Sequence, residues 1–273
     1  MTTLRIGALE VAVVSDGALA LDPARMFGRV DEAAWRPVTD LDEHGQVPVG
    51  VNCLLVRSGE RRILLDTGGG QTLALERSQN CGRLFESLAA FGVAPGDIDT
   101  VVISHAHWDH AGGASVRSGD AWLPAFPNAN YWLWRGEWDY WMNPALADRP
   151  AFLDDVLPPL VEHKRLELAD SEIEVAPGVR IITAPGHTPG HLCVALTSGS
   201  EMGVYTGDMF HHASQIEHPE WSPLFDVLPE LSAETRRAIF ERARREGQIL
   251  LTAHLPTPGI VRLPAAGGME VLG

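Results

Sequence analysis

One short stretch of the chain, SHAHWDH at residues 104–110, holds four side chains that can bind a metal. They are His105, His107, Asp109 and His110. Three more follow at wide intervals in the segments PGHTPGH, YTGD and LTAH, namely His187, Asp208 and His254. Neutral imidazoles and carboxylates are the usual ligands of zinc and other borderline divalent metals. Because seven ligands exceed what one tetrahedral ion uses, the count predicts two metals that share a site.

The spacing inside this stretch predicts how the ligands are divided. Residues 98–103 are apolar and β-branched, which is typical of a buried strand. Residues i and i+2 of an extended chain point the same way, so His105 and His107 are expected to bind one ion together. Glycines at 112–113 allow the chain to bend. This bend is expected to direct the other two ligands toward a second ion.

Each of the three later ligands also follows an apolar, strand-like run. His187 follows residues 179–184, Asp208 follows residues 203–207, and His254 follows residues 249–253. The ends of a sheet are where loops collect catalytic groups on a rigid base. For any one of these residues alone, a structural histidine or a capping aspartate would be the better interpretation. The recurrence of the same arrangement favours a metal site.

The order H-x-H-x-D-H, G-H-T-P-G-H, T-G-D and A-H resembles that of the metallo-β-lactamase-fold superfamily of hydrolases. Upstream, residues 52–56 and 63–68 resemble the opening hairpin of that superfamily. The resemblance extends from about residue 50 to residue 258. It implies an α+β fold, a four-layer αββα sandwich with the metals at one edge of the two sheets.

The resemblance also implies a role for each ligand. It assigns His105, His107 and His187 to a first metal, Asp109, His110 and His254 to a second, and Asp208 to a bridge between them. The cofactor is expected to be two divalent ions, foremost Zn²⁺, with Mn²⁺, Co²⁺ and Fe²⁺ as alternatives.

Two such ions lower the pKa of a shared water enough to give hydroxide at neutral pH, and they polarise a carbonyl or phosphoryl oxygen. We therefore expect a dinuclear hydrolase that uses a metal-bound hydroxide on a small lactone, ester or phosphotriester. Asp109 is expected to orient the water or accept its proton. Asp66, at the end of a predicted strand, is expected to orient one imidazole, with a turn aspartate as the alternative.

His211 is the second predicted catalytic residue. Lactonases of the superfamily that cleave acyl-homoserine lactones carry a tyrosine three residues after the bridging aspartate, and His211 occupies that position here. The departure argues against that narrow substrate assignment, although a histidine can still donate to a carbonyl or a leaving group. His191, four residues after His187, is expected to be structural.

Other activities on the same fold stay open. One is a mononuclear iron persulfide dioxygenase, which holds its iron with two histidines and an aspartate. Another is a glyoxalase II-like thioester hydrolase. A β-lactamase is less favoured, because such enzymes are generally secreted. A non-catalytic binding protein on this fold would typically have lost ligands, and none is missing here.

Length and composition bound these alternatives. The chain of 273 residues with 45% hydrophobic content fits a single domain over 1–273, with 1–50 as an N-terminal strand and loop extension. A net charge of −15 argues against a nucleic-acid partner. The N-terminus lacks a signal-peptide pattern, and no apolar run is long enough to span a membrane. We expect a cytoplasmic enzyme acting on a small molecule, and a homodimer stays open.

Local patterns give further expectations. Cys53 and Cys193 are expected in the core and Cys81 at the surface, with no metal-binding spacing among them. The sequence predicts a strand over 4–15 that ends at Asp16-Gly17 and a hairpin of 51–56 and 62–66. It also predicts a helix around 32–35 and a helix from Leu84 to Gly92. A third helix is expected to run from a Ser232 cap to Glu246, with its arginines on the solvent-exposed sides. The aromatic segment 131–141 is expected either to pack on the sheet or to line the cleft.

Overall fold

The apolar runs of the amino-terminal half pair into one sheet. The computed structural model describes residues 2–70, 80–147 and 149–272, and within these ranges the sheet has seven strands. In spatial order they are β1 (Thr2–Ile6), β2 (Leu9–Leu21), β3 (Val47–Ser58), β4 (Arg61–Leu65), β5 (Thr100–Val102), β8 (Asn130–Trp134) and β9 (Leu166–Ala169). Neighbours from β1 to β4 are antiparallel, whereas β4, β5, β8 and β9 run parallel.

The later strands form a second sheet, also of seven strands in the described part. In spatial order they are β10 (Ile173–Ala176), β11 (Val179–Thr183), β12 (Leu192–Ser198), β13 (Glu201–Tyr205), β14 (Ile249–Leu251), β15 (Ile260–Arg262) and β16 (Glu270–Val271). Only the β13–β14 pair among these neighbours is parallel. A separate hairpin consists of β6 (Ser115–Ser118) and β7 (Ala121–Pro124).

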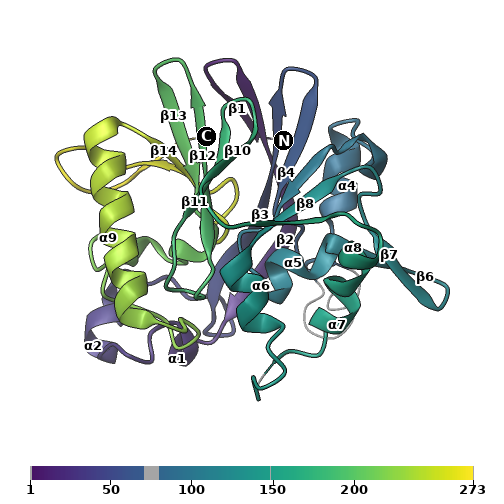
Figure 1. Cartoon of the computed structure of the whole chain (residues 1–273). Helices are drawn as coiled ribbons and strands as arrows, with labels where there is room; N and C mark the ends of the chain where they lie inside the picture. Colours follow the sequence, from purple (N-terminus) through teal and green to yellow (C-terminus); the bar gives the residue numbers. More distant parts are fainter. Residues whose placement is uncertain (1, 71–79, 148, 273) are drawn as a thin grey trace.

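Helices cover the outer face of each sheet. The described helices are α1 (Pro23–Met26), α2 (Glu32–Trp35), α4 (Leu84–Ala90), α5 (Trp108–Ala111), α6 (Arg135–Trp141), α7 (Leu153–Val156), α8 (Pro158–Glu162) and α9 (Pro229–Glu246). Figure 1 shows α9 against the second sheet, α4 to α8 against the first, and α1 and α2 across one end of the sandwich. This order of layers confirms the predicted αββα fold class.

Separate hydrophobic clusters hold the layers together. One lies between the sheets and includes Leu54, Ile63 and Leu196, all fully buried. A second joins the first sheet to its helices, and a third joins the second sheet to α9. Burial of one such side chain stabilises the fold by roughly 1.5–3 kcal/mol. The residues that carry chemistry are therefore mounted on a rigid double sheet. No described helix is long and apolar enough to cross a bilayer.

The N-terminal extension contributes more strand than the sequence predicted. The expected strand over 4–15 is two strands joined at Gly7, and β2 continues through Asp16 to Leu21. The pairing with β3 shifts register between Ser15 and Gly17, which is a β-bulge and not a turn. The Asp16 carboxylate accepts hydrogen bonds from backbone N–H groups of residues 69, 82 and 84. These bonds explain why an Asp-Gly pair lies inside the strand.

Three other local expectations were wrong. Helix α9 begins at Pro229, so Ser232 lies in its first turn and is not its cap. Arg236, predicted on a wet face, is fully buried, because its guanidinium donates to the carbonyls of Met209 and Pro219. Cys81, predicted at the surface, is buried too.

Candidate metal centre

The predicted ligands gather at the end of the sandwich where α1 and α2 lie. Strand β5 ends at Val102, so His105 and His107 lie on the loop that follows it and not on the strand itself. Asp109 and His110 belong to α5, the bend that was expected after the strand. The three later ligands follow β11, β13 and β14. All seven therefore lie in the segments that follow strand ends, five outside the α-helices and Asp109 and His110 in α5.

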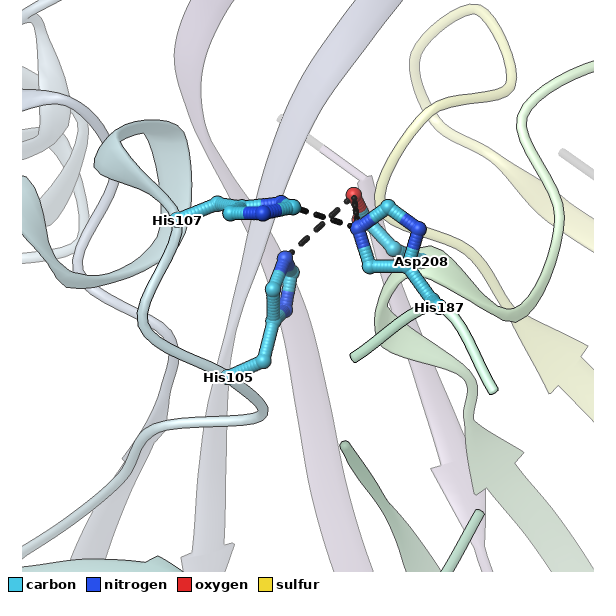
Figure 2. Close-up of side chains that lie close together, drawn as sticks. All are labelled: His105, His107, His187 and Asp208. Carbon is cyan, nitrogen blue, oxygen red and sulfur yellow. Dashed lines mark hydrogen bonds and ion pairs between the residues drawn. The ribbon is translucent and has the colours of Figure 1, made fainter. Parts of the chain in front are cut away.

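The structure brings these side chains close enough to one another to share metal ions. One group of potential ligand atoms belongs to His105, His107, His187 and Asp208, and Figure 2 shows these four side chains pointing toward one another. A second group belongs to Asp109, His110 and His254, and a third to Asp208, His211 and His254. The atoms of each group lie within 4.8 Å of one another. The first two groups contain the residues of the two predicted sets, with the predicted bridge Asp208 in the first, and the assignment of metals to them stays a prediction.

The Asp208 carboxylate lies between the two sets. Its Oδ1 atom is 2.7 Å from His110 Nε2 and 2.8 Å from His254 Nε2. Its Oδ2 atom is 3.1 Å from His187 Nε2 and 3.5 Å from His105 Nε2. One oxygen thus faces the first set and the other faces the second. This is the geometry that a bridging carboxylate needs.

The second set is arranged for a cation and not for internal hydrogen bonding. His254 Nδ1 lies 2.8 Å from the Gly50 carbonyl, which can only accept, so the ring proton sits on Nδ1. His110 Nδ1 lies 2.7 Å from the Asp66 carboxylate and is protonated by the same reasoning. The Nε2 atoms of the two rings face each other at 3.2 Å, and both also face Asp208 Oδ1. Burial lowers the pKa of both rings, but the neighbouring carboxylates, Asp208 foremost, outweigh burial and raise it, so a positive charge is favoured between these nitrogens, which a divalent cation would also supply.

The first set shows the same arrangement. His187 Nδ1 lies 2.8 Å from Asp226 Oδ1, and its Nε2 atom lies 2.9 Å from His107 Nδ1 and 3.1 Å from Asp208 Oδ2. His105 Nε2 and Asp208 Oδ1 are buried atoms without a hydrogen-bond partner in the described part of the chain. Buried polar atoms are rarely left without a partner. Their donor types and orientation fit divalent cations.

The pKa values of the clustered histidines show that protons compete with a metal ion for this site. Burial lowers the pKa of His187, but the Asp208 and Asp226 carboxylates outweigh burial and raise it to about 9. Burial and the neighbouring imidazoles hold the pKa values of His105 and His107 well below their usual range. The metal-free site therefore takes up protons at some ligands, and binding of a metal must release them.

His211 lies closer to the ligands than its sequence position predicted. Its Nε2 atom is 3.0 Å from Asp208 Oδ2, and its ring stacks on His254 with the centroids 4.8 Å apart. Its Nδ1 atom is buried without a hydrogen-bond partner among the described residues, and burial lowers its pKa to about 4. His211 is thus a neutral imidazole that contacts both the bridging carboxylate and the cleft.

His191 lies outside the three ligand groups and supports the bridge from behind. Its Nδ1 atom lies 2.9 Å from the Ala184 carbonyl, and its Nε2 atom accepts a hydrogen bond from the Asp208 backbone N–H. A Cβ atom at Gly207 would come within 2.7 Å of that Nε2 atom. The glycine of the T-G-D motif is therefore required for this contact.

A cleft of about 190 Å³ opens onto the ligands. Its remaining lining is apolar or aromatic apart from one arginine, and comprises Leu19, Leu21, Arg25, Val49, Trp108 and Phe225. The aromatic segment 131–141 contributes nothing to this lining. Its tryptophans pack into the hydrophobic clusters, and Trp141 places its ring 5.5 Å from that of His107. The core interpretation of this segment is the correct one.

Residues 47–254 match the family model described as metallo-beta-lactamase superfamily. The chain belongs to this superfamily. The superfamily match includes all seven predicted ligands, because they lie between residues 105 and 254. The predicted membership of this superfamily is confirmed.

Relatives within the superfamily are hydrolases. An N-acyl homoserine lactonase of Bacillus thuringiensis is 26% identical over 218 residues, which cover 74% of this chain and 80% of the relative. The structure of AidC, a dizinc quorum-quenching lactonase, has a TM-score of 0.84 and 26% identity, covering 99% of this chain and 96% of that one. The hydrolase AbOPH has a TM-score of 0.83 and 26% identity, covering 98% and 95%. These relatives confirm the prediction of a metal-dependent hydrolase.

Asp66 orients the predicted ligand His110, and its own backbone is strained. Its φ of 61° lies in the left-handed region, which costs a non-glycine residue about 1–3 kcal/mol. Its Oδ2 atom accepts hydrogen bonds from the Ser104 and Tyr205 hydroxyls and from His110 Nδ1, each at 2.7 Å. This geometry agrees with the predicted orienting role.

Sequence reasoning missed Asp226. It is buried, its Oδ1 atom accepts from His187, and its Oδ2 atom lies 3.4 Å from Arg236 Nη2. Burial raises the pKa of Asp226, but the bond to His187 and the charge of Arg236 outweigh burial and hold it at about 2. Asp226 thus stays ionised and fixes the tautomer of a ligand, as carboxylates behind metal-bound histidines do. No local motif marks it.

Glu137 is the other missed residue. One oxygen accepts from Ala106 N at 2.8 Å and Trp141 Nε1 at 2.7 Å. The other accepts from Thr188 Oγ1 at 2.6 Å and Gly190 N at 3.1 Å. This fully buried carboxylate therefore ties the loop that carries His105 and His107 to the loop that carries His187. Its only sequence signal was an acidic residue on an apolar, aromatic helix.

Glu137→Gln should weaken the first metal site selectively. The amide keeps one acceptor oxygen but turns a donor toward groups that themselves donate, such as Gly190 N. We expect the affinity of the first site to fall roughly 10–100-fold, with the second site retained. Titration of metal-free protein with Zn²⁺ against a colorimetric chelator measures both affinities. Glu86→Gln on the exposed face of α4 is the matched control. Equal weakening of both sites, or no change, would contradict the assignment.

Proposed function

We propose that the chain is a dinuclear hydrolase, with zinc as the resident metal, that cleaves small lactones, esters or phosphotriesters. The main support for the proposal is that the two carboxylate oxygens of Asp208 face separate sets of imidazole Nε2 atoms. The dizinc lactonase AidC supports the metal, and AidC together with the Bacillus thuringiensis lactonase supports the reaction class. The cytoplasmic location and the homodimer stay predictions.

The chain's own residues supply orientation and proton handling. Two bound cations would lower the pKa of a water and polarise the scissile carbonyl. Asp109 Oδ2 lies 3.6 Å from His254 Nε2 and 3.8 Å from His110 Nε2, and Asp109 also lines the cleft. It is therefore placed to hold the water's proton beside the substrate. The apolar walls of the cleft limit access of bulk water, which strengthens charge interactions inside it.

The competing activities need different things from the site. A mononuclear dioxygenase needs only one ligand set, whereas Asp109, His110 and His254 also converge here, which supports two ions. A thioester hydrolase would use the same two ions, so only the substrate separates it from the proposed activity. The decisive assay is a panel of lactones, aryl esters, thioesters, phosphotriesters and β-lactams with zinc, manganese and cobalt forms.

Metal removal is expected to abolish hydrolysis and to destabilise the fold. Elemental analysis should give about two ions per chain, because two ligand sets are present. At free metal 100 times above the dissociation constant, each ion adds about 2.7 kcal/mol, so chelation of two ions should lower the thermal midpoint by about 10 °C. Differential scanning calorimetry before and after chelation, and after reloading, measures this. One ion per chain at full activity would overturn the dinuclear proposal.

A further inference from the structure

Among the described residues, Arg25 is the only lysine or arginine in the lining of the metal cleft. It lies on α1, whose start is fixed by Pro23 and by a hydrogen bond from Ala24 N to the Asp22 carboxylate. The next two residues, Met26 and Phe27, are buried. A short helix anchored at both ends therefore presents Arg25 to the cleft.

The guanidinium is held by an aromatic ring and not by an acid. Its Cζ atom lies 6.0 Å from the centroid of the Phe225 ring, and the Arg25 carbonyl accepts from Leu224 N at 2.8 Å. Among the described residues no carboxylate pairs with Arg25, although the chain carries 36 acidic residues against 21 basic ones. A cation over a ring keeps its N–H groups available to a ligand.

Phe225 also fixes the distance from this cation to the reaction centre. Its ring lies edge-on to His211 at 4.8 Å and to His187 at 6.0 Å. Arg25 thus stands one aromatic ring away from the metal ligands. The carboxylates of Asp109 and Asp208 lie at the opposite, metal end of the cleft. A ligand that reaches the metal end with one group would therefore place a group at its other end beside a cation that no described carboxylate pairs with.

We propose that Arg25 makes the enzyme selective for lactones or esters that carry a carboxylate about one ring's width from the scissile carbonyl. This inference rests on the proposed hydrolase function. An arginine fork can bind both oxygens of a carboxylate, which a neutral amide or ester cannot match. Leu19, Leu21 and Phe225 would contact the apolar body between the two ends. The cleft of about 190 Å³ suits a compact substrate, because pockets for drug-sized ligands run from roughly 300 Å³ upward.

Binding of two matched probes tests the proposal without turnover. Terephthalate has carboxylates at both ends of one ring, and monomethyl terephthalate has one of them masked. Isothermal calorimetry on metal-loaded protein should show terephthalate binding roughly tenfold tighter or more. Arg25→Met should remove this preference, and Arg25→Lys should keep part of it. Arg117→Met, on the exposed β6–β7 hairpin, makes the same change in net charge and should leave the preference intact.

Turnover of a second probe pair separates failure of this inference from failure of the proposed function. The pair is 4-acetoxybenzoate and methyl 4-acetoxybenzoate, and the Arg25→Met change should lower kcat/KM for the first by roughly tenfold more than for the second. Unchanged probe preference in Arg25→Met, or equal binding of both terephthalates by the native protein, would overturn the role of Arg25. If neither ester, nor any lactone or phosphotriester, is hydrolysed, the proposed function is overturned even if the binding preference is found.

Discussion

Replacing Asp208 with alanine is expected to cause the largest loss of any single substitution. The two carboxylate oxygens face different ligand sets, so the change removes a ligand from both at once. It also removes the negative charge that faces the Nε2 atoms of four histidines. We expect loss of both metals and a fall in kcat/KM of more than roughly 10³-fold, beyond the 10–100-fold typical of residues behind the ligands. Elemental analysis and hydrolysis of the best substrate measure the two effects.

Two kinds of variant give this result its meaning. His107→Ala and His254→Ala each remove one ligand from one set, so each should cost less than Asp208→Ala. Asp226→Asn removes only the charge behind His187 and should cost roughly 10–100-fold. If Asp208→Ala kept near-normal metal content and rate, or ranked below the histidine variants, the bridging assignment would be wrong.

The ligands were predictable because their signal is local. Each stands a few residues after an apolar run, and strands that end at one edge of a sheet deliver their loops to the same place. The exact geometry was less accessible. The sequence extended the strand before His105 to residue 103, whereas β5 ends at Val102, because β8 pairs with only Thr100 to Val102. The shared direction of His105 and His107 is therefore set by a loop.

Residues that act through distant partners left no such signal. Glu137 bonds to groups on loops 31 residues before it and 51 residues after it, and Asp226 bonds to a histidine 39 residues away. These partners meet only when the two sheets pack. The same physics explains the error at Arg236, since arginine in a helix is usually exposed. Here Asp226 and two backbone carbonyls offset the cost of its burial.

His211→Ala is expected to lower turnover while both metals stay bound. The side chain lines the cleft and lies 3.0 Å from the bridging carboxylate, which places a neutral ring beside the substrate. Because burial lowers the pKa of His211 to about 4, the imidazole is neutral near neutral pH, and its one N–H, on Nε2, faces Asp208 Oδ2 until a substrate oxygen competes for it. Loss of a positioned donor costs roughly 10²-fold in kcat. Steady-state kinetics at matched metal content measure this loss.

Two further variants separate catalysis by His211 from a structural role. His211→Gln keeps a donor and should recover part of the rate, which a packing role would not predict. His212→Ala should matter less, because His212 is turned away to Ser214 Oγ at 2.8 Å and to the edge of Phe27. Loss of one metal in His211→Ala would instead identify His211 as a ligand, since its Nε2 atom already lies in a group with Asp208 and His254. An unchanged rate in His211→Ala would show that His211 has only a packing role.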